Sequence, residues 1–171
     1  AALYTEAVDG QHYAYLMLLP PRPGSEPPAP RELVLVVDRS GSMGGAPIEQ
    51  ARASVRAALA ALRPEDHFNV IAFDDKVDAL YPGRRPAAPE ALAAARRFVD
   101  RLDARGGTEM RPALDLALPA QEREQAGRLR QVVFITDGAV GNERALFARI
   151  RERLGRGRLF TRENVYEIAL I

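Results

Sequence analysis

One stretch of the sequence, LVLVVDRSGSMGG at residues 33–45, constrains the fold more than any other. Its first five residues are apolar without interruption, which is typical of a strand that is covered on both faces. An aspartate, two serines and three glycines follow directly. In open α/β sheets, ligands bind beyond the carboxyl ends of the strands. The stretch therefore predicts a buried central strand with a polar site at its carboxyl end.

Strands and helices alternate along the rest of the chain. Apolar runs predict further strands at residues 12–19, 67–73 and 132–135. Apolar residues at helical spacing predict helices at residues 47–62, 90–102, 112–118 and 142–154. This alternation is typical of an α/β fold in which a mostly parallel central sheet carries helices on both faces.

The first 30 residues have a different character. The strand predicted at residues 12–19 is followed by PPRPGSEPPAP at residues 20–30, whose six prolines exclude a helix or an inner strand. The preceding segment is too short to be a domain. We therefore expect a lead-in strand and a Pro-rich loop in residues 1–30, and one domain in residues 31–171.

Composition excludes several classes of function. The net charge is +1, so no nucleic acid partner is expected, and no apolar run is long enough for membrane insertion by this segment. The chain has no cysteine, which excludes disulfides, thiol catalysis and sulfur-ligated zinc.

Five oxygen-bearing side chains are expected at one edge of the sheet. Asp38, Ser40 and Ser42 follow the first buried strand, Asp137 follows the strand at 132–135, and Thr108 lies in the glycine-rich GGTEM. In a partly extended loop, the alternation Asp-x-Ser-x-Ser makes the first three side chains point the same way. An all-oxygen set suits a hard cation, so we expect Mg²⁺ or Mn²⁺, with Ca²⁺ as an alternative.

Each of these residues also has a plainer interpretation. The serines can satisfy backbone groups in a tight turn, Thr108 can be a helix N-cap, and Asp137 can be a turn former. Asp74 and Asp75 also follow a predicted strand, and we expect them in a solvated loop.

The sequence lacks the residues and motifs that the enzymatic alternatives require. Ser42 resembles the nucleophile of G-x-S-x-G, but Ser40 replaces the first glycine. A serine hydrolase of that type needs a late histidine, and both His12 and His67 precede Asp137. No phosphate-binding G-x-x-x-x-G-K-[ST] loop is present. We therefore expect no catalytic residues, and a metal-assisted hydrolase is the weaker alternative.

Together, DRSGSM, GGTEM and TDG resemble the metal-ion-dependent adhesion site (MIDAS) of the von Willebrand factor A domain family. HFNVIAF and RQVVFITDGAVGNE are similar to the subgroup found in inter-alpha-trypsin inhibitor heavy chains and their bacterial relatives. The resemblance covers residues 33–160 and implies a Rossmann-like three-layer fold. It implies that Ser40 and Ser42 ligate the metal directly, Asp38 and Asp137 act largely through water, and Thr108 binds directly or through water.

The same resemblance implies a metal-dependent adhesion module that captures an Asp or Glu of a protein partner, in an extracellular or bacterial envelope location. A structural domain with an idle metal site is the other alternative. The sequence departs from the family pattern at its end, where RENVYEIALI follows at residues 162–171. We therefore expect a truncated or altered C-terminal end, in which residues 165–171 supply a strand or mediate self-association.

Overall fold

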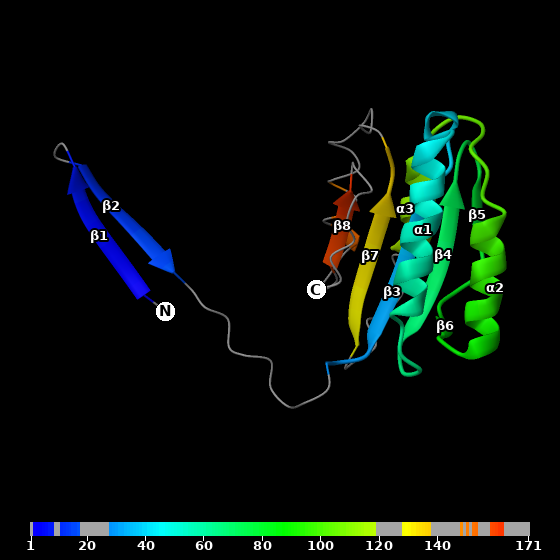
Figure 1. The fold of residues 1–171 in the computed structure, drawn as a ribbon, viewed down its shortest axis with the longest axis horizontal. Coiled ribbons are helices and arrows are strands. Elements are labelled where there is room, and N and C mark those ends of the chain that lie inside the picture. The colour runs from blue at the N-terminus through cyan, green and yellow to red at the C-terminus, as the bar shows by residue number, and fades with distance from the viewer. Residues whose placement is uncertain are drawn as a thin grey trace.

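The computed structural model describes residues 2–8, 11–17, 28–118, 128–137, 148, 150, 152–153 and 158–162 (Figure 1). Strands β1 (Ala2–Val8) and β2 (Gln11–Met17) form an antiparallel two-stranded sheet. A second sheet contains β3 (Arg31–Asp38), β4 (His67–Phe73), β5 (Val77–Ala79), β6 (Arg85–Pro86), β7 (Leu129–Ile135) and β8 (Arg158–Arg162). The helices are α1 (Ala46–Ala60), α2 (Pro89–Asp100) and α3 (Met110–Ala117), and a 3₁₀ turn spans Gly41–Met43.

The larger sheet has the order β5-β4-β3-β7-β8, with β6 paired to β4. Strands β4, β3, β7 and β8 are parallel, whereas β5 and β6 run antiparallel to β4. The register sets Asp38 beside Phe73 and Val37 beside Ile135. Three neighbouring strands therefore end at the same level, and the loops that follow them share one edge of the sheet.

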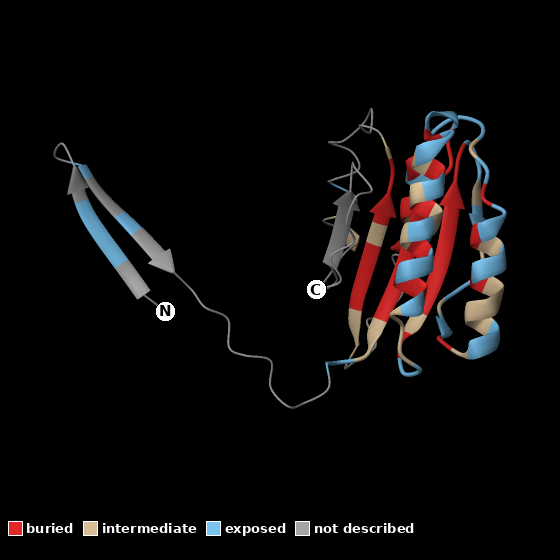
Figure 2. Cartoon of the chain, in the orientation of Figure 1, coloured by how far each residue is buried: buried red, intermediate tan, exposed pale blue. Residues whose placement is uncertain are grey.

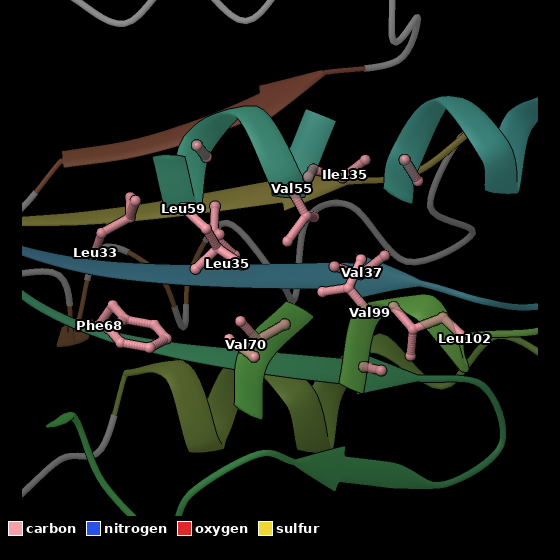
Figure 3. Packing of buried hydrophobic residues seen from close by; sticks show 14 of the residues in the cluster. Leu33, Leu35, Val37, Val55, Leu59, Phe68, Val70, Val99, Leu102 and Ile135 are labelled. Atoms are coloured by element: carbon pink, nitrogen blue, oxygen red, sulfur yellow. The ribbon is translucent and has the colours of Figure 1, made fainter. Parts of the chain in front are cut away.

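Helices cover both faces of β3, as predicted. On one face, α1 and α2 pack on a cluster that contains Leu35, Val37 and Val70 (Figure 3). On the other face, α3 packs on Val34, Val36 and the strands beside them. Figure 2 shows the resulting buried centre of the sheet. The three-layer α/β architecture is confirmed.

Most predicted elements are found within one to three residues of their expected bounds, and β4 coincides with its prediction. Helix α3 begins at Met110, two residues before the predicted start, because Pro112 is tolerated in a first helical turn. Strand β7 begins three residues before its predicted start. The apolar pattern missed this part of the strand because Arg130 and Gln131 are polar, although both are buried. The Nε of Arg130 donates a hydrogen bond to Oε2 of Glu32 at 3.2 Å, which makes that burial possible.

Four strands were not predicted: β1, β5, β6 and β8. Strands β5 and β6 are only three and two residues long and lie at the side of the sheet, where no apolar pattern is required. Of the helix predicted at 142–154, the described residues 148, 150, 152 and 153 are helical. The Pro-rich segment 20–27, residues 18–19 of the first predicted strand and the tail 163–171 lie outside the described residues.

A buried carboxylate stabilises the end of the sheet at which β3 and β4 begin, which is opposite to the end that carries the predicted site. The side chain of Asp66 is fully buried and accepts hydrogen bonds from the backbone N–H of Arg31 at 2.8 Å and of Arg63 at 3.0 Å. The guanidinium of Arg31 forms an ion pair with the same carboxylate at 2.9 Å. Burial alone would raise the pKa of Asp66, but these backbone donors and Arg31 lower it to about 2.

We predict that Asp66 makes the stability of the chain depend on acid. Its pKa is lower in the folded state than in the unfolded chain, so its contribution is fully present above about pH 4 and is lost as pH falls towards 2. The wild type should lose about 2 kcal/mol from this group over that range, and Asp66→Asn should show a shallower decline. Urea unfolding at several pH values measures the free energy of unfolding of both proteins. If that free energy falls with pH as steeply in the variant as in the wild type, the assignment is contradicted.

Candidate metal centre

Four of the five predicted site residues gather where β3 and β7 end. Asp38 is the last residue of β3, and its Oδ1 accepts a hydrogen bond from the backbone N–H of Ser40 at 2.8 Å. The hydroxyl oxygens of Ser40 and Ser42 lie 3.1 Å apart. The Ser42 hydroxyl donates to Oδ1 of Asp137 at 3.0 Å. The two strands thus bring together side chains that lie 95 to 99 residues apart in sequence.

The carboxylate of Asp38 is held on both of its oxygens. It is buried, and its Oδ2 accepts a hydrogen bond from the hydroxyl of Thr136 at 2.7 Å. We did not predict a role for Thr136. The signal was its place in TDG, directly after a strand that pairs with β3. Because both oxygens are engaged, the orientation of Asp38 is set by β3 and β7 together.

The serine hydroxyls are not needed for helix capping. Ser40 is the N-cap of the 3₁₀ turn, and its side chain makes no capping hydrogen bond. It is buried, whereas Ser42 is exposed and Asp137 is partly exposed. The cluster is therefore closed beneath Ser40 and open to solvent at Ser42.

Thr108 is exposed, and within the described part of the chain its side chain makes no hydrogen bond to the other four predicted residues. It is not the N-cap of α3, because Glu109 takes that place. Its loop is nevertheless joined to the loop between β3 and α1 (residues 39–45, the site loop) by a hydrogen bond from the backbone N–H of Gly41 to the carbonyl of Gly106 at 3.1 Å. Gly106 has φ +68°, and a Cβ there would lie 2.7 Å from Oδ1 of Asp75, so glycine is required.

The prediction that Asp74 lies in a solvated loop is wrong, although Asp75 is exposed as expected. Asp74 is buried, and its Oδ2 lies 2.9 Å from Nε of Arg39 and accepts a hydrogen bond from Nε of Arg105 at 3.1 Å. Its carbonyl accepts a hydrogen bond from the backbone N–H of Glu109 at 2.7 Å. Arg39 belongs to the site loop, and Arg105 and Glu109 flank Thr108, so Asp74 joins the two loops.

The charge of Asp74 is favoured in the folded protein. Burial alone would raise the pKa of this carboxyl, but a hydrogen bond from the backbone N–H of Lys76, another from Arg105 and the charge of Arg39 lower it to about 2. Since Asp74 stays ionised at neutral pH, its pairing with both arginines persists under ordinary conditions.

The donor set fits a small divalent cation. In an octahedral magnesium site with oxygen ligands at about 2.1 Å, neighbouring ligand oxygens lie roughly 3 Å apart. The hydroxyl oxygens of Ser40 and Ser42, the two residues expected to ligate directly, lie 3.1 Å apart, which is close to that spacing. Among the described residues, no three His, Cys, Asp or Glu side chains gather as a metal cluster, so the fit depends on the serine hydroxyls.

A sequence model of the von Willebrand factor type A domain matches residues 31–161, most of the chain. The chain belongs to this family. As a vWA domain, it is 34% identical over 142 residues to human inter-alpha-trypsin inhibitor heavy chain H4, a match that covers 77% of this chain and 15% of that protein. The chain thus spans about a seventh of that relative.

Solved structures agree with the fold. A von Willebrand factor type A protein from Catenulispora acidiphila superposes with a TM-score of 0.62 at 25% identity, covering 78% of this chain and 33% of the other. The pilus adhesin SpaC from Lactobacillus rhamnosus GG superposes with a TM-score of 0.56 at 21% identity, covering 67% and 16%. Family membership places this vWA domain among protein-interaction modules of the adhesion type in general.

We predict that Asp74 holds the Thr108 loop in place. In Asp74→Asn, the weakened pairing with Arg39 and Arg105 should speed amide hydrogen exchange of residues 105–109 by about tenfold or more. Asp66→Asn is the matched control, since Asp66 is equally buried and arginine-paired but lies at the opposite edge of the sheet. Equal acceleration of this loop in both variants would show only general destabilisation.

Proposed function

We propose that this vWA domain binds Mg²⁺ or Mn²⁺ at its candidate metal centre and uses the ion to hold a carboxylate of a protein partner. Ser40 and Ser42 would ligate directly, Asp38 and Asp137 would act largely through water, and Thr108 would complete the set. The observation that carries the proposal is the continuous series of hydrogen bonds that runs from Asp38 through Ser40 and Ser42 to Asp137.

The charges favour an acidic ligand. The two hydroxyls nearest the proposed ion are neutral, and one of the two carboxylates, Asp38, is already engaged by Ser40 and Thr136. A bound divalent ion supplies positive charge at the solvent-exposed end of the cluster. Ser42 and Asp137 lie at that end, so an incoming Asp or Glu side chain would reach the ion there.

We infer a binding role and not a catalytic one. His67 begins β4, at the edge of the sheet opposite the end of β3, so it cannot act as a base at Ser42. The buried acid–base pair nearest the site, Arg39 and Asp74, is a stable ion pair and not a group poised to exchange protons.

An extracellular or cell-envelope location fits this proposal. The likeness to a pilus adhesin and to a heavy chain of the inter-alpha-trypsin inhibitor favours it. Within the part of the chain that the structure describes, no helix is long and apolar enough to cross a membrane. Self-association through the C-terminal tail remains a prediction, since residues 163–171 lie outside the described part.

The proposal predicts stabilisation by metal. After treatment with EDTA, Mg²⁺ or Mn²⁺ at one hundred times its dissociation constant should add about 2.7 kcal/mol to the folded state, because only the folded chain presents the site. Thermal unfolding measures the shift. Asp38→Ala should abolish it, since the loop geometry depends on both oxygens of that carboxylate.

Asp103→Ala is the matched control, because Asp103 is an exposed aspartate that pairs with Arg52 and is not a proposed ligand. It should keep the full metal response. If wild-type protein shows no shift with any divalent cation, the proposed ion site does not form in this chain. If the metal binds but acidic peptides do not bind to the metal-loaded domain, the alternative of an idle metal site is favoured.

A further inference from the structure

A pocket lies between the C-terminal end of α2 and the segment that follows β5, and its volume is about 320 Å³. Its apolar lining includes Leu80, Phe98 and Leu102. Three arginines also line it: Arg39, Arg97 and Arg101. A hollow with apolar walls and convergent cations is suited to a ligand that is partly apolar and negatively charged.

The arginines of the pocket differ in their partners. Arg39 is neutralised, because its guanidinium pairs with both Asp74 and Asp78. Arg97 and Arg101 are exposed, and among the described residues neither has a carboxylate within ion-pair distance. The pocket therefore carries an excess of two positive charges that the described part of the chain does not balance.

Helix electrostatics account for only part of this arrangement. Cations near a helix C-terminus stabilise it, and Nε of Arg101 donates to the carbonyl of Arg97 at 3.2 Å. This role requires a positive charge at the end of α2. It does not require that both arginines line an apolar hollow beside Phe98.

The pocket adjoins the candidate metal centre. Arg39 stands between Asp38 and Ser40 in the chain, so the same loop supplies both the proposed ion site and one wall of the pocket. The proposed ion site and the pocket are therefore connected through a single loop. The volume is at the lower end of the range of about 300–1,000 Å³ for ligand sites, which suits one or two side chains better than a cofactor.

We propose that this pocket binds an acidic residue and an adjacent apolar residue of the protein partner whose other carboxylate reaches the metal centre. The identity of that partner as a protein rests on the proposed function. Arg97 and Arg101 receive the carboxylate, since a guanidinium binds a carboxylate through paired charge-assisted hydrogen bonds. Phe98 and Leu80 contact the apolar side chain. The pocket thus adds a second, metal-independent requirement for a partner: an acidic–apolar pair near the carboxylate at the metal centre.

The test uses the complete 171-residue chain, labelled with ¹⁵N and kept in EDTA, and a blocked peptide Glu-Phe-Glu as the probe. Titration should give saturable chemical-shift changes at the amides of Arg97, Phe98 and Arg101. The double variant Arg97→Ala with Arg101→Ala should bind the peptide at least about tenfold more weakly, from the loss of charge-assisted hydrogen bonds. Arg96→Ala is the matched control, because Arg96 is exposed on the same helix but does not line the pocket.

A second probe keeps the result independent of the folding of the variants. The neutral peptide Gln-Phe-Gln should bind the wild-type chain at least about tenfold more weakly, and raised salt should weaken Glu-Phe-Glu. The proposal is overturned if no saturable shifts appear at α2, if Arg96→Ala weakens binding as much as the double variant, or if the neutral peptide binds equally well.

The metal proposal is judged separately. The wild-type chain should bind the peptide in EDTA, because the pocket needs no ion. If the peptide binds but no divalent cation stabilises the wild type, the pocket stands and the metal centre fails. If a divalent cation stabilises the wild type but the peptide does not bind, the metal centre stands and the pocket proposal fails.

Discussion

Strand β3 lies between β4 and β7, and both of its faces are covered by helices. Residues Leu33 to Val37 are buried to 3% exposure or less, so each contributes about 1.5–3 kcal/mol relative to an exposed side chain. The candidate site is positioned from this strand. Asp38 ends it, Arg39 continues it towards Asp74, and its register with β7 brings Thr136 and Asp137 to the same edge.

At each end of the strands, a buried aspartate that pairs with arginine holds the neighbouring segments together. At the edge where β3 and β4 begin, Asp66 is buried, accepts backbone hydrogen bonds and pairs with Arg31, which fastens the start of the sheet. At the edge where they end, Asp74 is buried in the same manner but joins two loops through Arg39 and Arg105. A buried carboxylate is costly unless it is fully paired, so both sites hold their loops in a single arrangement.

The site loop faces in two directions. The side chain of Ser40 contacts that of Ser42, which donates to Asp137. The side chain of Arg39, the residue between Asp38 and Ser40, pairs with Asp74 and lines the arginine-lined pocket. Alternation of side chains along an extended backbone accounts for the opposite directions of Arg39 and Ser40, and the 3₁₀ turn at Gly41–Met43 then places Ser42. A change at Arg39 or Asp74 can therefore affect both the proposed ion site and the pocket, although neither residue is a proposed metal ligand.

The sequence by itself determined the architecture and the composition of the candidate site. An uninterrupted apolar run indicates burial on both faces, and the order of strands and helices indicates parallel crossovers, so the end of β3 was expected where sheets of this class bind ligands. Asp38, Ser40, Ser42 and Asp137 could be named from motifs that directly follow such strands.

Only the tertiary structure decided how these residues are held. Thr136 meets Asp38 because the register of β3 with β7 sets them side by side, and no local pattern encodes that register. The sequence predicted Asp74 in a solvated loop, because the arginines that pair with it are distant in the sequence. In the folded chain, Arg39 and Arg105 reach its carboxylate and make its burial possible. The pocket between α2 and the segment after β5 likewise arises from packing, because Arg39 and Arg97 lie 58 residues apart in sequence and meet only in the folded chain.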